Sequence, residues 1–244
     1  MKMRPILDSL DIPAVFFVNA LPYAENKVSL VHKIHYIRAN LSPQVLFDKI
    51  SAEYSKRSGK KYELASLVDK DIAKNSYRYD KDVDAQLKFV LNTAWNSDLL
   101  KPIVEEIFLE LVSDEAEFCS KWYLGPEQIV ELAERQYFGF HSYSHNPLSK
   151  MSTDAVKKDM KTCFKTFEKL VKKTIQGMSY PYGYTEAVSL DVARACSEVG
   201  IKFAFTMERA FNRTLQSPLL FARADTNDVP GGKTLCSQSR MIPR

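Results

Sequence analysis

Short apolar runs alternate with amphipathic helical segments between residues 121 and 225, and this alternation restricts the fold more than any other feature of the chain. The predicted strands are Tyr137–Phe140, Met178–Tyr180, Ile201–Thr206 and Leu219–Arg223. The predicted helices are Glu127–Arg135, a segment that begins at Ser152 or Thr153, and Leu190–Glu198. Strands and helices in this order form a parallel sheet with right-handed crossovers, so the sequence predicts an α/β fold.

The helix that begins at Ser152 or Thr153 has an apolar face and a basic face. Its apolar residues recur at helical spacing, at Val156, Met160, Cys163, Phe164, Phe167 and Val171. Lysines occupy other positions, at Lys157, Lys158, Lys161, Lys165, Lys169, Lys172 and Lys173. We interpret the lysines as a solvated helix face, and a surface for an anionic glycan or lipid is the alternative.

The N-terminal segment predicts one more strand. Ala14–Val18 is an apolar run rich in β-branched and aromatic residues, and such a run suits a strand that is buried on both faces. A helical pattern precedes it, and Asp11-Ile-Pro13 marks the turn between the two. We therefore expect this strand to belong to the same parallel sheet as the strands after residue 121.

Residues 25–120 differ from the rest, because almost nothing in them alternates with the period of a strand. Apolar residues recur at helical spacing instead, at Val28, Val31, Ile34 and Ile37, at Val83, Leu87, Val90 and Leu91, and at Ile103, Val104, Ile107, Phe108 and Leu111. Ser42-Pro43 is a typical helix start. We expect a helical insertion that contributes no strand to the main sheet.

Composition restricts the partners of the chain. Its 244 residues, 45% of them hydrophobic, can form one large domain or two small ones with a substantial core. The net charge of +4 is too small to require a nucleic acid or a membrane surface, so no nucleic-acid partner is expected. No apolar run is long enough for a transmembrane helix, and no signal peptide is visible. Cytoplasm and cell envelope both remain open as locations.

The four cysteines predict neither a metal site nor a redox site. Cys119, Cys163, Cys196 and Cys236 have no C-x-x-C spacing, which argues against a zinc knuckle and a dithiol motif. Cys163 and Cys196 lie at apolar positions of predicted helices, where a cysteine behaves as a small hydrophobic residue. A disulfide framework is not expected at this length and cysteine density.

Two histidines, His141 and His145, directly follow the predicted strand Tyr137–Phe140. Imidazoles at positions i and i+4 can bind one divalent metal ion if they share a helical turn or a loop that curls over one point. A surface turn with two ordinary histidines is the alternative. The other two histidines, His32 and His35, lie on a predicted helix of the insertion, and we interpret them as ordinary helix residues.

A second candidate segment, Ser179-Tyr-Pro-Tyr-Gly183, follows the next predicted strand. The alternative is that it forms only a tight turn. Asp225 follows the last predicted strand in the same way. In parallel α/β folds, ligands bind at the C-terminal ends of the strands, so these segments are expected at one rim.

In this order, the two segments resemble motifs of the polysaccharide deacetylases, the NodB-homology enzymes of carbohydrate esterase family four. Members have H-(S/T)-x-x-H and, further on, Pro-aromatic-Gly; here the residues are His141-Ser-Tyr-Ser-His145 and Pro181-Tyr-Gly183. The resemblance covers residues 4–22 and about 122–229, and leaves the insertion unmatched. It implies a distorted (β/α) barrel made of residues 1–24 and 121–244, without its first strand, and a large helical insertion at 25–120.

The resemblance also implies an activity and a site. The family members are hydrolases that act on carbon–nitrogen bonds other than peptide bonds and remove N-acetyl, or sometimes O-acetyl, groups from amino sugars of a glycan. His141 and His145 match the metal ligands, and the metal would be zinc or cobalt. Tyr182 would hold the oxyanion through its backbone N–H and line the sugar pocket with its ring. Arg223 and Asp225 match a downstream Arg-x-Asp segment, which would act in catalysis, orient other site residues or bind the inserted chain.

The chain also departs from the family pattern. It contains no Asp-Asp pair, which in the family supplies a metal ligand and the general base, and no late Leu-x-x-His segment, whose histidine is the general acid. Ser179 stands where an arginine is common. We therefore expect residues 1–244 to hold metal weakly and to show negligible activity without an Asp-Asp strand. A catalytically inactive, glycan-binding or scaffold protein is the alternative, and a metal hydrolase of another class is a third.

Overall fold

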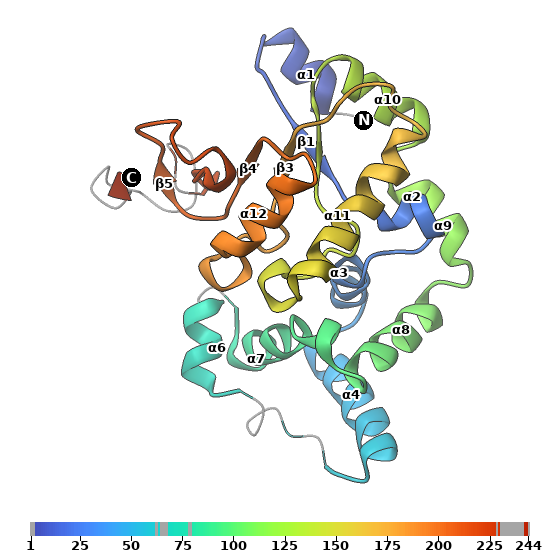
Figure 1. The fold of residues 1–244 in the computed structure, drawn as a ribbon. Coiled ribbons are helices and arrows are strands. Elements are labelled where there is room, and N and C mark those ends of the chain that lie inside the picture. Colours follow the sequence, from blue (N-terminus) through green and yellow to red (C-terminus); the bar gives the residue numbers. More distant parts are fainter. Residues whose placement is uncertain are drawn as a thin grey trace. The chain divides into compact units, whose positions relative to one another are not determined.

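The computed structural model describes residues 3–61, 63, 68–77, 80–227, 229 and 242–243. The chain divides into two compact units (Figure 1). Met1–Glu25 and Trp122–Arg244 form the sheet unit, and Asn26–Lys121 form the helical unit. Within the described ranges, every helix is too short or too polar for a membrane span.

Four short strands among the described residues of the sheet unit form one parallel sheet. In spatial order they are β1 (Phe16–Val18), β2 (Phe138–Phe140), β3 (Gly177–Ser179) and β4 (Phe203–Phe205). Because all of them run in the same direction, their C-terminal ends lie at one edge, where the following loops meet. The predicted α/β fold with a parallel sheet is confirmed, and closure into a barrel stays a prediction.

Helices connect the strands as the alternation in the sequence predicts. The helices of the sheet unit are α1 (Met3–Ser9), α2 (Leu21–Glu25), α10 (Pro126–Glu134), α11 (Thr153–Glu168) and α12 (Leu190–Glu198). Single 3₁₀ turns lie at η2 (Leu148–Lys150), η3 (Thr185–Ala187) and η4 (Pro218–Leu220), and the two-residue strands β5 (Ala210–Phe211) and β6 (Ile242–Pro243) pair with each other. Ser152 caps α11, where its Oγ accepts a hydrogen bond from the N–H of Ala155 at 3.3 Å.

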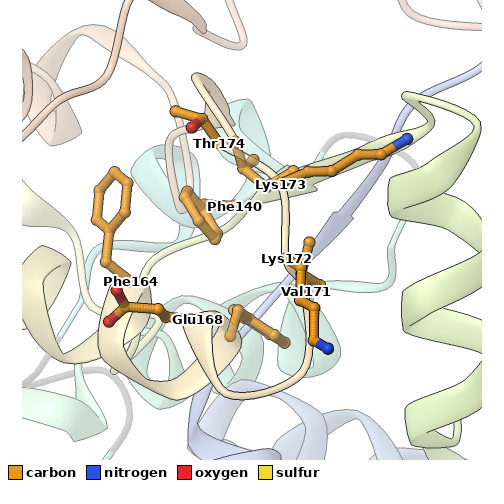
Figure 2. A pocket seen from close by; sticks show the side chains of 9 residues that line it. Phe140, Phe164, Glu168, Val171, Lys172, Lys173 and Thr174 are labelled. Carbon is orange, nitrogen blue, oxygen red and sulfur yellow. The ribbon is translucent and has the colours of Figure 1, made fainter.

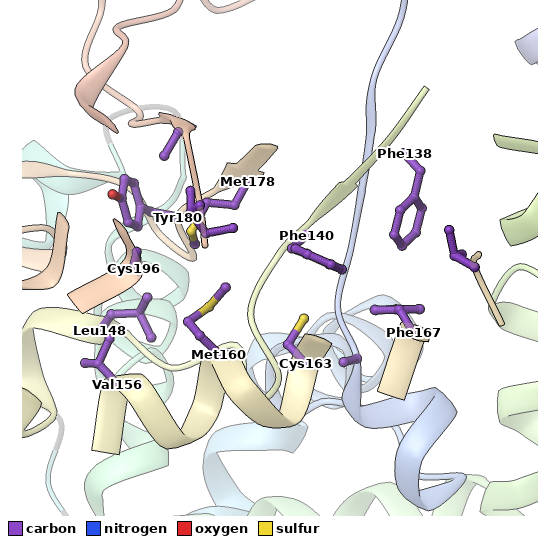
Figure 3. Packing of buried hydrophobic residues seen from close by; sticks show 14 of the residues in the cluster. Phe138, Phe140, Leu148, Val156, Met160, Cys163, Phe167, Met178, Tyr180 and Cys196 are labelled. Atoms are coloured by element: carbon purple, nitrogen blue, oxygen red, sulfur yellow. The ribbon is translucent and has the colours of Figure 1, made fainter. Parts of the chain in front are cut away.

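The core of the sheet unit lies between the strands and the apolar face of α11 (Figure 3). Met160, Cys163 and Phe167 of this helix are at most 1% exposed. The Phe167 ring lies 4.9 Å from that of Phe138, and the Phe164 ring lies 4.6 Å from that of Phe140, measured between centroids. This packing holds α11 against β2, so the loop between them is anchored at both ends.

Among the described residues of the helical unit, every regular element is a helix. The α-helices are α3 (Leu30–Asn40), α4 (Pro43–Ser58), α6 (Lys70–Ser76), α7 (Asp82–Leu91), α8 (Leu100–Leu111) and α9 (Glu115–Trp122), which ends at the first residue of the sheet unit, and η1 (Ala94–Asn96) is a 3₁₀ turn. Ser42 caps α4 and accepts a hydrogen bond from the N–H of Val45 at 3.4 Å. The helical spacing of the apolar residues in 25–120 agrees with these helices.

A buried lysine connects three parts of the helical unit. Lys33 on α3 is 2% exposed, and its ammonium group forms ion pairs with Glu105 and, at 2.7 Å, with Glu115. The Glu115 carboxylate also accepts a hydrogen bond from the N–H of Val28 at 2.8 Å. The Lys33 Nζ lies 5.1 Å from the centroid of the Phe108 ring. This cluster holds the start of α3 against α8 and α9.

The prediction of a strand at Leu219–Arg223 was wrong. Pro218–Leu220 forms a 3₁₀ turn, and Phe221 makes a single parallel bridge to Phe205. Proline has no N–H to donate to a sheet ladder, which favours a turn at this point. The segment is nevertheless attached to β4, because the N–H of Phe221 donates to the Ala204 carbonyl at 2.9 Å.

The three cysteines in the described residues, Cys119, Cys163 and Cys196, are free and buried. Burial raises the pKa of the Cys163 and Cys196 thiols, the latter to about 12, so both stay protonated at neutral pH. They therefore pack as small hydrophobic residues. Cys236 lies outside the described residues.

Candidate active site

The histidine loop, which we define as residues 141–146, leaves β2 at the C-terminal edge of the sheet. The N–H of His141 donates to the Val18 carbonyl at 3.0 Å, and its ring nitrogen Nδ1 lies 2.7 Å from the Ser179 carbonyl oxygen. Because a carbonyl oxygen only accepts, Nδ1 carries the proton and Nε2 keeps its lone pair. A histidine oriented in this way by a backbone carbonyl is typical of metal ligands.

The rings of His141 and His145 lie side by side, with centroids 4.8 Å apart and planes at 79°. This approach depends on two residues with left-handed backbone, Ser142 at φ +58° and His145 at φ +59°. The buried Ser142 hydroxyl accepts a hydrogen bond from the N–H of His145 at 3.0 Å and so closes the turn. The loop therefore brings together the two imidazoles that the motif singles out, and their role as ligands stays a prediction.

The surroundings of His141 favour its neutral form. Burial lowers the pKa of its imidazole, and the positive charge of Arg223 lowers it further, while the hydrogen bond to the Ser179 carbonyl acts in the opposite direction. A neutral imidazole is the form that binds a cation.

Tyr182 lies in a tight turn beside the histidine loop. Its ring is 5.5 Å from that of His145 and 6.1 Å from that of Tyr184, between centroids. Tyr182 and Gly183 both have φ +62°, and the N–H of Gly183 donates to the Pro181 carbonyl at 2.7 Å. The turn is fixed to the segment that follows β4, because the Gly183 carbonyl accepts a hydrogen bond from the N–H of Met207 at 2.6 Å. Pro181-Tyr182-Gly183 is thus a tight turn, and it places the Tyr182 ring next to the histidines.

Replacing Gly183 with alanine is expected to lower the free energy of unfolding by about 2–4 kcal/mol. The added Cβ would lie 2.7 Å from the backbone nitrogen of Met207, and the left-handed φ adds strain of its own. Gly59→Ala is the matched control, because Gly59 has φ +67° but open space around the missing Cβ. Urea unfolding of both variants separates the steric clash from the backbone strain. Equal losses at the two positions would refute the close approach to Met207.

Arg223 and Asp225 differ in their relation to the site. The positive charge of Arg223 lowers the pKa of His141, and the backbone N–H of Arg223 donates to the Glu208 carbonyl at 2.9 Å. Asp225 accepts hydrogen bonds from the backbone and side-chain nitrogens of Asn227, at 2.8 and 2.9 Å, and these bonds lower its pKa. The Asp225 carboxylate is thus engaged by its own turn, and a catalytic role for either residue stays a prediction. Asp228 lies outside the described residues.

Two buried polar side chains contact the histidine loop but are not predicted as site residues from the sequence. Asn19, directly after β1, donates hydrogen bonds to the carbonyls of Ser142 and Tyr143. Asp159 on α11 accepts hydrogen bonds from the N–H groups of Tyr143 and Ser144. One feature of the sequence could have pointed to Asp159. It is a charged residue next to Met160, on the apolar face of α11.

A cavity of about 420 Å³ lies elsewhere in the sheet unit, beside the C-terminal half of α11 (Figure 2). Aromatic and aliphatic side chains form its walls, and lysines and a glutamate lie at its rim. The residues that line it are Phe140, Phe164, Phe167, Glu168, Val171, Lys172, Lys173, Thr174 and Ile175. None of the candidate site residues lines this cavity, so it is separate from the histidine loop.

The histidine loop fits part of a metal site. Zinc binds imidazole nitrogens at about 2.0–2.1 Å, and catalytic zinc sites commonly have three protein ligands. The close rings, and the lone pair left on His141 Nε2, suit two of these positions. Within the described ranges, no group of three or more histidine, cysteine or acidic side chains is placed to hold one ion. Whether His141 and His145 bind a metal ion stays a prediction.

Comparison with known proteins identifies relatives of this chain. The family model described as polysaccharide deacetylase matches residues 82–203. The match includes His141, His145 and Tyr182, and Arg223 and Asp225 lie beyond it. The match begins at α7, within the segment that was expected to be unmatched, and it does not extend to residues 4–22. No curated protein matches the chain.

Solved structures of deacetylases are also similar to this chain. A polysaccharide deacetylase from Bacillus cereus is 20% identical with a TM-score of 0.35, and the match covers 41% of this chain and 32% of that one. A deacetylase from Streptococcus pyogenes, in complex with acetate, is 17% identical with a TM-score of 0.38, and the match covers 52% and 57%. The chain therefore matches about a third of the first structure and somewhat more than half of the second.

Proposed function

The chain belongs to the polysaccharide deacetylase family, and we propose that it removes N-acetyl, or O-acetyl, groups from the amino sugars of a glycan by metal-dependent hydrolysis. The observation that carries the proposal is the close pair of imidazoles, 4.8 Å apart between ring centroids, on the family's H-S-x-x-H motif at His141 and His145. Its position at the C-terminal edge of a parallel sheet adds support, because ligands of such folds bind at this edge.

The histidines would act as two ligands of one divalent cation, zinc or cobalt. His141 would bind through Nε2, since Nδ1 is hydrogen-bonded to the Ser179 carbonyl. When bound, the cation supplies Lewis acidity toward the acetyl carbonyl and toward the attacking water. The chain's own contribution is to fix the two imidazoles and to keep that of His141 neutral.

Tyr182 would contribute its backbone N–H and its ring. A backbone donor that is aimed at the developing oxyanion typically lowers the barrier by about 3–4 kcal/mol. The ring lies beside His145 and would form one wall of the sugar site. Arg223 would add positive charge near the reacting carbonyl, and Asp225 would orient the segment that carries Arg223. These roles come from the family resemblance and the proximity described above.

In members of the family, as the resemblance implies, an Asp-Asp pair supplies a metal ligand and the general base. The sequence of residues 1–244 contains no two adjacent aspartates. A positioned base that takes the proton of the attacking water typically raises the rate by about 10²- to 10⁴-fold. Residues 1–244 alone are therefore expected to show little turnover.

Acetate release from acetylated chitooligosaccharide tests this function. We expect release by protein that carries an N-terminal strand with Thr-Phe-Asp-Asp-Gly before residue 1, and loss of release when a chelator removes the metal. Residues 1–244 without the strand are the control, and their turnover should be at least about 100-fold lower. Equal turnover with and without the strand would mean that another residue is the base, and no turnover in either would remove the proposal.

A glycan-binding or scaffold protein without activity is the second candidate. It is favoured by two sequence observations, the lack of an Asp-Asp pair and Ser179 in place of the common arginine. Measurements on the protein with the added Asp-Asp strand distinguish the deacetylase from the binding protein. Binding of chitooligosaccharide without acetate release, at saturating zinc, would establish the second candidate.

A further inference from the structure

The backbone of the histidine loop is held from two sides by buried side chains of other elements. On one side lies Asp159 of α11, which is 5% exposed. Its Oδ1 accepts a hydrogen bond from the N–H of Tyr143 at 2.8 Å, and its Oδ2 accepts one from the N–H of Ser144 at 2.9 Å. A carboxylate offers two acceptors on one rigid group, which matches two consecutive amides.

On the other side lies Asn19, which is also 5% exposed and directly follows β1. Its Nδ2 donates to the Ser142 carbonyl at 3.0 Å and to the Tyr143 carbonyl at 2.6 Å. The backbone N–H of Ala20 reaches the same Ser142 carbonyl at 3.0 Å. The donors on this side of the loop thus complement the acceptors that Asp159 presents on the other.

The loop needs such support because its conformation is strained. Ser142 and His145 both have left-handed backbone, which costs about 1–2 kcal/mol for each residue with a side chain. Such conformations persist only where surrounding contacts over-determine them. If these contacts were lost, Ser142 and His145 would relax toward ordinary φ values, and the His145 ring would turn away from His141.

We propose that Asp159 and Asn19 are positioning residues that hold His141 and His145 in the geometry that binds one divalent cation. The inference rests on the proposed function for the identity of the bound ion. Neither side chain belongs to the histidine motif, and neither is assigned as a ligand. Their effect on the cation is indirect, through the backbone between the two imidazoles.

Substitutions that keep shape and change hydrogen-bonding ability are the most informative. Asp159→Asn keeps the size of the side chain, but its amide group must turn a donor toward one of the two N–H groups. Asn19→Asp places a carboxylate against two carbonyl oxygens, which repel it. Val156→Ala is the matched control, because Val156 is a fully buried residue of the same helix and forms none of these hydrogen bonds.

Cobalt binding to the full chain, followed by titration calorimetry and visible absorption, tests the inference. We expect Asp159→Asn and Asn19→Asp to weaken binding about 10- to 100-fold, as replacement of groups behind metal ligands typically does. Val156→Ala should lower the melting temperature and leave the affinity unchanged. Unchanged affinity in both loop variants, or an equal loss in Val156→Ala, would overturn the inference.

Amide hydrogen exchange without metal separates this inference from the proposed function. If the wild-type chain binds no cobalt, the proposed ligand role fails, and the exchange of residues 141–148 still reports on the loop. We expect Asp159→Asn to accelerate exchange in this segment at least about 10-fold more than Val156→Ala does, because one of its backbone amides loses its acceptor and faces a donor instead. Equal acceleration in the two variants would show that Asp159 only stabilises the fold.

Discussion

Replacing His145 with alanine is expected to lower kcat for acetate release at least about 100-fold in protein that carries the Asp-Asp strand. Replacing a residue that merely supports a metal ligand typically costs about 10- to 100-fold, so loss of a ligand should cost no less. His141→Ala should have a similar effect. The measurement is acetate release at saturating substrate with zinc or cobalt present.

His32 and His35 provide the control for this experiment. They form another close pair of histidine rings, with centroids 6.3 Å apart, on α3 of the helical unit. His35→Ala should leave kcat within about twofold of wild type, since surface substitutions of this kind have small effects. Turnover that survives in His145→Ala, or falls equally in His35→Ala, would remove the histidine loop from the reaction.

Lys33→Ala is expected to lower the free energy of unfolding of the helical unit by about 3–5 kcal/mol. The substitution leaves Glu105 and Glu115 without their shared cation, and Glu115 has only 17% of its side chain exposed. Lost contact between the lysine and the Phe108 ring adds to the effect. Urea unfolding followed by circular dichroism measures the change.

Lys49 is the matched control, because it also pairs with a glutamate, Glu110 at 2.6 Å, but both side chains are largely exposed. Exposed ion pairs contribute about 0–1 kcal/mol, so Lys49→Ala should change stability by no more than that. A comparable, small loss for Lys33→Ala would mean that the buried cluster is not a stabilising feature of the helical unit.

Local periodicity explains why much of the fold can be predicted from sequence. The apolar residues Met160, Cys163 and Phe167 recur with the helical period, and the structure buries all three on one face of α11. Proline and serine at helix starts are equally local signals, as Ser42 and Ser152 demonstrate. Such signals depend only on neighbours along the chain, so a single sequence contains them.

Contacts between distant residues explain what the sequence does not reveal. Asn19 bonds a loop 123 residues further along the chain, and no local pattern encodes that pairing. Phe221 lies in an apolar run that suits a strand, yet a turn precedes it and a single bridge attaches it to β4. The two histidines could be singled out because their motif is local. The side chains that hold their loop could not, because their role depends on the tertiary structure.

Anomalous diffraction from zinc-soaked crystals tests most directly whether His141 and His145 bind one cation. At the zinc absorption edge we expect one peak beside the histidine loop, about 2.0–2.1 Å from a ring nitrogen of each histidine, with His141 contributing Nε2. The Nδ1 of His141 should remain bonded to the Ser179 carbonyl. Imidazoles that point apart, or zinc that binds elsewhere and leaves this pair empty, would contradict the proposed metal site.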